Sequence, residues 1–272
     1  MKNTPPSSPP QFHPPLRLWI HGLTGRMGEA MTQEIRRDKT HESFQLLGGS
    51  TKDQLVEVLN MGKSVTVETL GHVLSRDHPQ VILDFTSPDG NKLLLETLLE
   101  FPEITSAVVI GTTGLSSSLL DWWRALENQR AVLFAPNTSV GIVQILRAAH
   151  HIAKALTALD FDLEIVETHH RLKKDSPSGT ALFLAKSLAS HLEQTIVENP
   201  RGERAAGSIG VHGVRGGMVV GEHEIRFLGM DQEISLKHRA FDRAVFASGA
   251  LRLARWAARQ KPGIYQLEDV SI

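Results

Sequence analysis

The side chains best suited to chemistry lie in one segment of fifteen residues, from Glu167 to Ala181. The segment contains two adjacent histidines, His169 and His170, and Lys173 follows four residues after the first. A histidine can donate a proton near neutral pH, and a lysine can stabilise negative charge that develops at a reacting atom. Because adjacent side chains of a strand point to opposite faces, we expect the two histidines to have different tasks.

The same segment ends with Ser178, Gly179 and Thr180 at the start of a predicted helix. Unpaired N–H groups and hydroxyls at a helix start form a pocket for an anion. With the histidines and the lysine, they would suit a small, doubly anionic substrate that is protonated while a hydride arrives. The alternative is that the histidines only lie on the surface and that Pro177 and Ser178 only begin a helix.

Composition and spacing argue against other kinds of site. Adjacent histidines on a strand do not converge on one ion, so no metal is expected. The chain has no cysteine, which excludes thiolate catalysis and iron–sulfur clusters. A net charge of −1 and a short basic cluster without stacking aromatics argue against a nucleic-acid partner. No apolar run approaches the ~20 residues that cross a membrane, so no membrane partner is expected.

A second candidate site lies near the amino terminus, where Gly22, Gly25 and Gly28 follow a predicted strand and lead into a predicted helix. Glycines allow a tight turn and let the backbone approach a diphosphate, which the helix start then attracts. The spacing is GxxGxxG instead of the GxGxxG dinucleotide fingerprint, because Thr24 stands where a second glycine would be. The alternative is a tight turn that binds no ligand.

The end of the next predicted strand bears on the choice of cofactor. An acidic residue usually stands there to bind the ribose 2′-hydroxyl of NAD, but this chain has Ser50, Thr51 and Lys52. Hydroxyls and a lysine suit a 2′-phosphate better, so the sequence leans towards NADPH, although Arg26 could serve either cofactor. Two later strand ends, 111–114 and 135–139, could hold a nicotinamide ring or could simply be turns.

Two kinds of pattern divide the chain. In the first half, continuous apolar runs alternate with helical stretches, which predicts a Rossmann-type doubly wound parallel sheet. The runs are Leu16–His21, Phe44–Leu47, Val81–Phe85, Ala107–Ile110 and Ala131–Ala135. In the second half, apolar and polar residues alternate from Phe161 and again in Glu222–Leu228 and Glu233–His238, which predicts a second α+β domain with an open mixed sheet.

Three further segments are interpreted by composition. The glycine-rich stretch from Gly202 to Gly221 predicts a mobile loop or lid. A long helix is expected from about Ala240 to Arg259. Residues 1–15 contain six prolines and no apolar core of a secretory signal, so a disordered leader on a cytoplasmic protein is expected.

The segment from Glu167 to Ala181 resembles the active-site signature of the dihydrodipicolinate reductase family, E-x-H-H-x-x-K-x-D-x-P-S-G-T-A, at every specified position. The resemblance extends over nearly the whole chain after the leader. It includes Gly22–Gly28, Asp84–Thr86, Gly111–Gly114, Ala135–Gly141, Arg215–Gly217, Gly221–His223, His238–Ala240 and Pro262–Tyr265.

The resemblance implies a role for each matching position. His169 would be the proton donor and Lys173 the second catalytic residue, while His170, Gly179 and Thr180 would contact the substrate carboxylates. Glu167, Asp175 and Pro177 are given no role beyond shaping the turn. The implied cofactor contacts are Gly22, Leu23, Thr24, Gly25, Arg26, Met27, Gly111, Thr112, Thr113, Ala135, Pro136, Asn137 and Thr138.

The resemblance further implies reduction of 4-hydroxy-tetrahydrodipicolinate to tetrahydrodipicolinate by NADPH or NADH, with loss of water, in lysine and diaminopimelate biosynthesis. It implies a homotetramer in which residues 16–138 and 244–272 form the dinucleotide-binding domain. Residues 139–243 would form the substrate-binding and oligomerisation domain. Two alternatives remain: an inactive dinucleotide-binding sensor of the same fold, and a dehydrogenase acting on another small acid.

Overall fold

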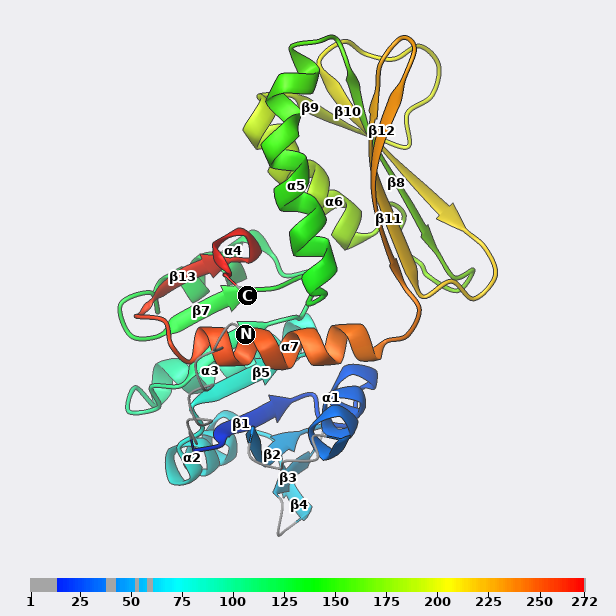
Figure 1. Cartoon of the computed structure of the whole chain (residues 1–272). Coiled ribbons are helices and arrows are strands. Elements are labelled where there is room, and N and C mark those ends of the chain that lie inside the picture. Colours follow the sequence, from blue (N-terminus) through cyan, green and yellow to red (C-terminus); the bar gives the residue numbers. More distant parts are fainter. Residues whose placement is uncertain (1–13, 38–42, 52–53, 58–60, 272) are drawn as a thin grey trace, which may run out of the picture.

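A computed structural model describes residues 14–37, 43–51, 54–57 and 61–271, and within them eight strands form the first sheet, in the order β13-β7-β6-β5-β1-β2-β3-β4 (Figure 1). Neighbours from β13 to β2 are parallel, and a β3–β4 hairpin extends one edge antiparallel. The predicted doubly wound parallel sheet is therefore confirmed. The bounds are β1 (Leu16–His21), β2 (Phe44–Ser50), β3 (Gln54–Glu57), β4 (Met61–Ser64), β5 (Val81–Asp84), β6 (Ala107–Ile110), β7 (Ala131–Phe134) and β13 (Gly263–Gln266).

Helices cover both faces of this sheet, which explains why its central strands are apolar throughout. On one face, Leu18 and Ile20 of β1 share a core with α1 (Arg26–Arg37) and α7 (Ala244–Ala257). On the other face, Trp19 is fully buried in a core with α2 (Val67–Asp77), α3 (Pro88–Glu100) and α4 (Ser117–Arg124). Burial of each such large side chain contributes roughly 1.5–3 kcal/mol.

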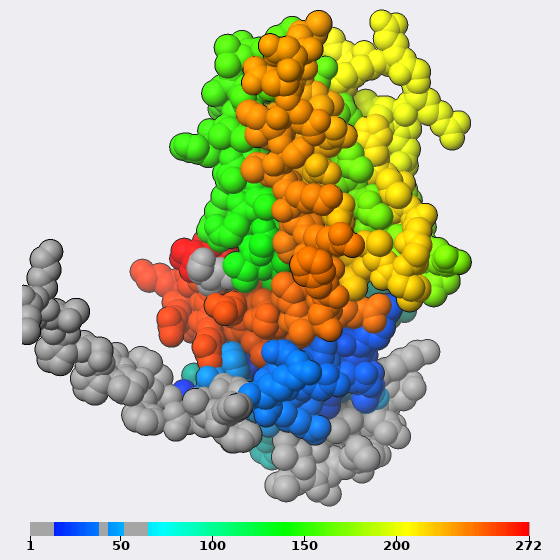
Figure 2. Space-filling model, turned by 45° about the vertical axis from the view of Figure 1, so that its right-hand side comes forward, coloured from blue at the N-terminus to red at the C-terminus, as the bar shows by residue number. Residues whose placement is uncertain are grey.

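The carboxy-terminal segment returns to the first sheet after the chain has built the second. Figure 2 shows its red and orange surface between the blue amino-terminal part and the green middle of the chain. Helix α7 packs on α1, β13 pairs with β7, and a short 3₁₀ helix η1 (Leu267–Asp269) follows. The helix begins at Ala244, later than the predicted Ala240, because the preceding strand continues to Ala240.

The second sheet is mixed, as predicted, and has the order β12-β11-β8-β10-β9. Helices α5 (Val140–Thr157) and α6 (Gly179–Leu192) share a core with the inward-facing residues of its strands. The bounds are β8 (Asp162–His169), β9 (Thr195–Glu198), β10 (Ser208–Arg215), β11 (Gly221–Leu228) and β12 (Glu233–Ala240). No helix among the described residues is both long enough and apolar enough to cross a bilayer.

The prediction of a mobile loop over Gly202–Gly221 is wrong for its middle part. Strand β10 occupies Ser208–Arg215 and pairs on both sides, with β8 and β9. Its glycines provide space, because a Cβ at Gly210 would lie 1.9 Å from Oε2 of Glu164. A Cβ at Gly213 would lie 2.2 Å from Oγ of Ser176. Close approach of neighbouring side chains, not flexibility, therefore accounts for these glycines.

Candidate active site

A cavity of about 660 Å³ lies where the carboxyl ends of the first sheet meet the end of β8. This volume is in the range of small-molecule sites, roughly 300–1,000 Å³. Eleven of the residues predicted for the site line it together: Arg26, Met27, Gly111, Ala135, Pro136, Asn137, Thr138, His169, His170, Lys173 and Thr180. The cavity therefore brings residues predicted to contact the cofactor next to residues predicted to contact the substrate.

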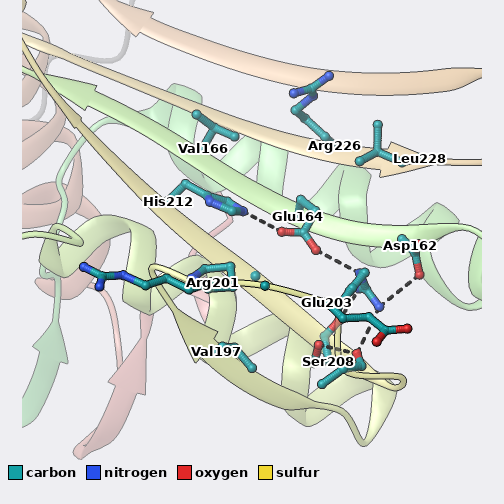
Figure 3. A pocket seen from close by; sticks show the side chains of 15 residues that line it. Asp162, Glu164, Val166, Val197, Arg201, Glu203, Ser208, His212, Arg226 and Leu228 are labelled. Carbon is teal, nitrogen blue, oxygen red and sulfur yellow. Dashed lines mark hydrogen bonds and ion pairs between the residues drawn. The ribbon is translucent and has the colours of Figure 1, made fainter.

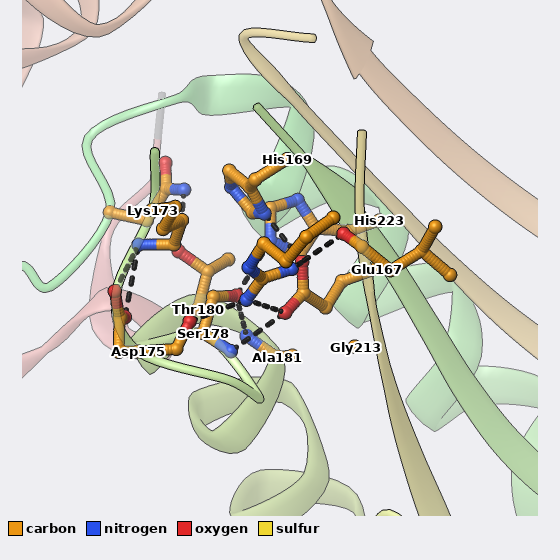
Figure 4. Close-up of polar contacts among 12 residues, drawn as sticks. Glu167, His169, Lys173, Asp175, Ser178, Thr180, Ala181, Gly213 and His223 are labelled. Carbon is orange, nitrogen blue, oxygen red and sulfur yellow. Dashed lines mark hydrogen bonds and ion pairs between the residues drawn. The ribbon is translucent and has the colours of Figure 1, made fainter. Parts of the chain in front are cut away.

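Strand β8 places His169 in this cavity. Alternate residues of the strand are buried, so Glu167 and His169 share the face that lies toward α6 (Figure 4). Nδ1 of His169 lies 2.5 Å from Oε2 of Glu167. A carboxylate can only accept, so the proton of this hydrogen bond belongs to Nδ1. The second ring nitrogen, Nε2, has no hydrogen-bond partner among the described residues and can exchange a proton with a ligand.

Glu167 is fully buried and is held by several donors. Both terminal nitrogens of Arg215 donate to it, at 2.8 and 2.6 Å, and the N–H of Ser178 donates to Oε1 at 2.9 Å. Burial alone would raise the pKa of Glu167, but the hydrogen bonds from His169 and Arg215 hold it at about 2. Glu167 is therefore an anion throughout the neutral range. The expectation that it only shapes the turn is too weak for a residue with these contacts.

Lys173 lies on the loop after β8, where its ammonium group donates to Asp175 at 2.9 Å. Burial would raise the pKa of Asp175, but this hydrogen bond and the lysine charge lower it. Among the described residues that line the cavity, Arg26, Lys173, Lys174 and Arg243 are basic and Asp175 is the single acid. The cavity therefore has an excess of positive charge that suits an anionic ligand.

His170 also lines the cavity, although it follows His169 directly. Partial desolvation, together with the positive charge of Arg243 and nearby cations, lowers the pKa of His170 below its usual value. The lowered pKa keeps the ring neutral near pH 7. Both adjacent histidines line the cavity, and their separate tasks stay a prediction.

The start of α6 brings hydroxyl and N–H groups to the same place. The Ser178 side chain caps the helix by accepting the N–H of Ala181 at 3.3 Å. The hydroxyl of Thr180 lines the cavity and accepts a hydrogen bond from Nδ2 of Asn137 at 2.9 Å. This contact joins the loop after β7 to the first turn of α6. Gly179 stands in that turn but does not itself line the cavity.

His223 of β11 also lines the cavity, although the sequence assigned no role to it. Its ring lies edge-on to that of His169, with 5.1 Å between centroids, and only 2% of the residue is exposed. Burial, reinforced by the charge of His169, lowers its pKa to about 3. Nε2 of His223 lies 3.3 Å from the hydroxyl of Ser178. With this pKa the ring of His223 is neutral near pH 7, and it shares a hydrogen bond with the Ser178 hydroxyl.

The turn between β1 and α1 has the shape expected of a diphosphate cradle. Gly22 has φ +96°, and a Cβ there would lie 2.6 Å from the carbonyl oxygen of Phe85. A Cβ at Gly28 would lie 2.3 Å from the carbonyl oxygen of Leu23. Gly22, Leu23, Thr24 and Gly25 form the turn beside the cavity but do not line it.

The loop after β6 is only partly within the cavity. Gly111 lines it, and a Cβ there would meet the Phe85 ring at 2.2 Å. The hydroxyl of Thr112 is occupied by the N–H of Thr86 at 2.9 Å, and Thr113 is exposed. Neither threonine lines the cavity, so their predicted cofactor contacts remain predictions.

The structure gives different results for the three residues that led the sequence to favour NADPH. Ser50 is fully buried and its hydroxyl bonds Nδ1 of His21, so the expectation that it faces a 2′-phosphate is wrong. Thr51 is partly exposed at the end of β2. Lys52 and nearly all of the proposed leader, residues 1–13, lie outside the described residues. Within the described ranges, no group of three or more metal-ligating side chains is found.

Comparison with known proteins gives concordant matches over nearly the whole chain. Residues 16–138 match the family model described as dihydrodipicolinate reductase, N-terminus, and residues 141–270 match the corresponding C-terminus. A protein of Rubrobacter xylanophilus named 4-hydroxy-tetrahydrodipicolinate reductase is 37% identical, covering 94% of this chain and 98% of that one. Its namesake from Nitratiruptor sp. is 36% identical, over 93% and 98%.

A solved structure shares the same architecture. The dipicolinate-bound dihydrodipicolinate reductase of Paenisporosarcina sp. TG-14 superposes with a TM-score of 0.70 at 26% identity, covering 94% of this chain and 100% of that one. An amine dehydrogenase of Mycobacterium smegmatis, at 11% identity and a TM-score of 0.58, shares the fold alone.

Proposed function

The chain belongs to the dihydrodipicolinate reductase family, and on this premise we propose how its residues reduce 4-hydroxy-tetrahydrodipicolinate. It is an NAD(P)H-dependent oxidoreductase of lysine and diaminopimelate biosynthesis. In the balanced reaction, the substrate, one reduced nicotinamide and one proton give tetrahydrodipicolinate, the oxidised nicotinamide and water. The observation that carries the proposed mechanism is the single cavity lined by His169, Lys173, Asn137 and Arg26.

The cofactor fits the turn after β1. The absence of a side chain at Gly28 lets Gly22 and Leu23 approach the start of α1, where a diphosphate would meet free N–H groups. Arg26 and Met27 extend from this helix start into the cavity, and Gly111 and Asn137 would flank the nicotinamide. The bound cofactor supplies a hydride to C4 of the substrate.

The substrate would bind through its two carboxylates at the start of α6. Thr180 offers a hydroxyl, the turn at Gly179 offers N–H groups, and His170 offers a neutral ring nitrogen. Lys173 adds positive charge beside them. Dipicolinate, which the Paenisporosarcina structure carries by its title, is also a cyclic dicarboxylate, and this supports a small dianion as the ligand.

We assign the proton to Nε2 of His169. Glu167 holds the Nδ1 proton, so a proton that leaves the ring toward the substrate leaves from Nε2. Loss of the C4 hydroxyl with a hydrogen of the neighbouring ring carbon would release water and leave a double bond. Hydride addition at C4 and delivery of the His169 proton to the neighbouring carbon would then saturate that bond. Lys173 would stabilise negative charge that develops on the substrate during the step.

Two substitutions test these roles. His169→Gln should lower kcat by about 100-fold or more, which is the usual worth of a general acid, and leave the dissociation constant of NADPH unchanged. A kcat near that of the wild type would refute the assignment. Lys173→Ala should raise KM and lower kcat together, and no change in either constant would refute its role.

The lean toward NADPH remains a proposal. It is supported by the absence of a carboxylate among the described residues at the end of β2 and by Arg26 at the start of α1. Calorimetric titration with both reduced cofactors tests it. Tighter binding of NADPH is expected, and equal or tighter binding of NADH would contradict it.

We also propose a homotetramer located in the cytoplasm. The division into residues 16–138 with 244–272 and residues 139–243 is kept, supported by the return of α7 and β13 to the first sheet. The second sheet would provide the interface, since α5 and α6 pack on one of its faces and Ile234 of β12 is 37% exposed. Light scattering should give four times the 30.0 kDa chain mass. A monomer mass would contradict the proposal.

A further inference from the structure

We infer that Glu167 and Arg215 together are positioning residues that fix the orientation and the proton-donating nitrogen of His169. The inference rests on the proposed role of His169 and adds a residue pair that the active-site signature does not connect. Glu167 and Arg215 lie on neighbouring strands β8 and β10, 48 residues apart in sequence.

Four donors surround the Glu167 carboxylate. Oε1 accepts from Nη2 of Arg215 at 2.6 Å and from the N–H of Ser178 at 2.9 Å. Oε2 accepts from Nη1 of Arg215 at 2.8 Å and from Nδ1 of His169 at 2.5 Å. The carboxylate is fully buried, so water does not compete for these oxygens. The bidentate arginine fixes the plane of the carboxylate and thereby the direction from which Nδ1 must approach.

The charges of this pair determine the tautomer of the histidine. The arginine remains protonated in proteins, and Glu167 has a pKa of about 2, so neither group can give or take the histidine proton near neutral pH. Nδ1 must therefore keep its hydrogen whether the ring is neutral or protonated. Nε2 is then the nitrogen at which the ring gains and loses a proton.

The carboxylate of Glu167 also connects His169 to the proposed substrate pocket through a hydrogen bond. Its bond to the Ser178 N–H fixes the residue that caps α6, directly before Gly179 and Thr180. Gly213 of β10 leaves space beside this bond, since a Cβ there would lie 3.1 Å from Oε1 of Glu167 and crowd it. Glu167 thereby sets the position of the proton donor relative to the groups that would hold the carboxylates.

The opposite face of β8 carries a chemically matched cluster that serves as a control. Glu164, three residues before Glu167, bonds Nε of Arg204 at 3.0 Å and Nε2 of His212 at 2.7 Å (Figure 3). It therefore has the same partner types as Glu167, a glutamate between an arginine and a histidine. None of these three residues lines the proposed active-site cavity.

The experiment is a double-mutant cycle on the full-length protein. Glu167→Gln replaces a group that accepts four hydrogen bonds by an amide whose NH₂ must face a donor. We expect kcat to fall by about 10- to 100-fold, and by no more than in His169→Gln, because the carboxylate acts only through this histidine. Binding of NADPH should be unchanged, and Glu164→Gln should retain the wild-type kcat. In His169→Gln, the further change Glu167→Gln should have less than a twofold effect on kcat, because the pair acts through His169.

The outcomes separate this inference from the proposed function. If His169→Gln keeps the wild-type kcat, the proton-donor assignment fails, and the inference that rests on it fails as well. If His169→Gln is impaired but Glu167→Gln is not, only the positioning role is refuted. The positioning role would also be refuted if the reductions in kcat of the two single variants multiplied in the double variant. The same holds if Glu164→Gln lowered kcat as much as Glu167→Gln, because both results would indicate a general structural role.

A second variant covers the case in which Glu167→Gln does not fold. Arg215→Lys keeps the positive charge but replaces two parallel donors by one ammonium group, so the carboxylate plane is no longer fixed. We expect kcat to fall by about tenfold with NADPH binding unchanged, since a misaligned proton donor slows the proton step. A wild-type kcat for a folded Arg215→Lys protein would refute the positioning role.

Discussion

Lowering the pH from 7 to 5 should destabilise the fold through one buried histidine, His223. Its pKa is about 3 in the folded chain, where burial disfavours the charged ring, compared with an ordinary value of 6.5. Because the folded pKa lies below the unfolded one, the stabilising effect is fully present above pH 6.5. It is lost as the pH falls toward 3, since the unfolded chain binds a proton that the folded chain does not.

The size of the effect follows from these two values. Each pH unit between them corresponds to about 1.4 kcal/mol. At pH 5, about 1.5 units below the unfolded pKa, the loss in the free energy of unfolding is therefore about 2 kcal/mol. At pH 3 it approaches about 5 kcal/mol. The loss is large enough to measure because whole domains are stable by only about 5–15 kcal/mol.

Urea unfolding of the wild type and of His223→Gln, at pH 7 and pH 5 and one protein concentration, measures this contribution. Glutamine does not titrate, while the titratable neighbours His169, His238, Glu167 and Lys173 are present in both proteins. The wild type should lose about 2 kcal/mol more than the variant between the two pH values. An equal loss in both proteins would refute the conclusion that His223 is held neutral by burial.

Three further substitutions follow from contacts in the structure. Gly28→Ala would place a Cβ 2.3 Å from the Leu23 carbonyl oxygen and should weaken NADPH binding, measured by fluorescence, by about tenfold or more. An unchanged affinity would argue that this turn does not bind the diphosphate. Asn137→Ala removes the 2.9 Å hydrogen bond to Thr180 and should raise KM several-fold with little change in melting temperature. An unaltered KM would show that this hydrogen bond does not contribute to substrate binding. Gly213→Ala would bring a Cβ to 2.2 Å from Oγ of Ser176 and 3.1 Å from Oε1 of Glu167, so these side chains must shift. The free energy of unfolding should fall by about 1 kcal/mol in urea titrations, and no reduction would contradict the close packing at this position.

The architecture was largely predictable because its strongest sequence signals arise from burial. Ala107–Ile110 is buried at all four positions, and its continuous apolar run was predicted with the observed bounds. Strand β8 is buried on one face, and the alternation predicted from Phe161 matches it to within one residue at its start. Helices α2 and α5 and strands β3, β4, β9 and β13 were missed. The four strands, with four residues each, are too short to show a clear period.

The error over β10 has a physical cause. Glycine is rare in strands, so the glycines at 210 and 213 favoured a loop. These glycines are needed because two side chains approach them closely: the carboxylate of Glu164 on a neighbouring strand and the hydroxyl of Ser176 in a loop. A pattern along one strand cannot show a contact that depends on which strand becomes its neighbour.

The site residues that are close in sequence could be predicted together, whereas those brought together by strand pairing could not. His169, Lys173 and Thr180 were predicted as a group because they lie within twelve residues of one another, and they do line one cavity. Arg215 and His223 come from other strands, and only the pairing of β8 with β10 and β11 brings them to His169. Their motifs were visible in the sequence, but the hydrogen bond to Glu167 and the ring contact required the fold.

The central claim is tested most directly by following the oxidation of NADPH with the freshly condensed product of pyruvate and aspartate semialdehyde, with and without this protein. We expect rapid oxidation that requires the protein, one tetrahydrodipicolinate formed for each NADPH consumed, and a rate about 100-fold lower for His169→Gln. NADPH that binds to the protein but is not oxidised would contradict the account and favour a dinucleotide-binding sensor.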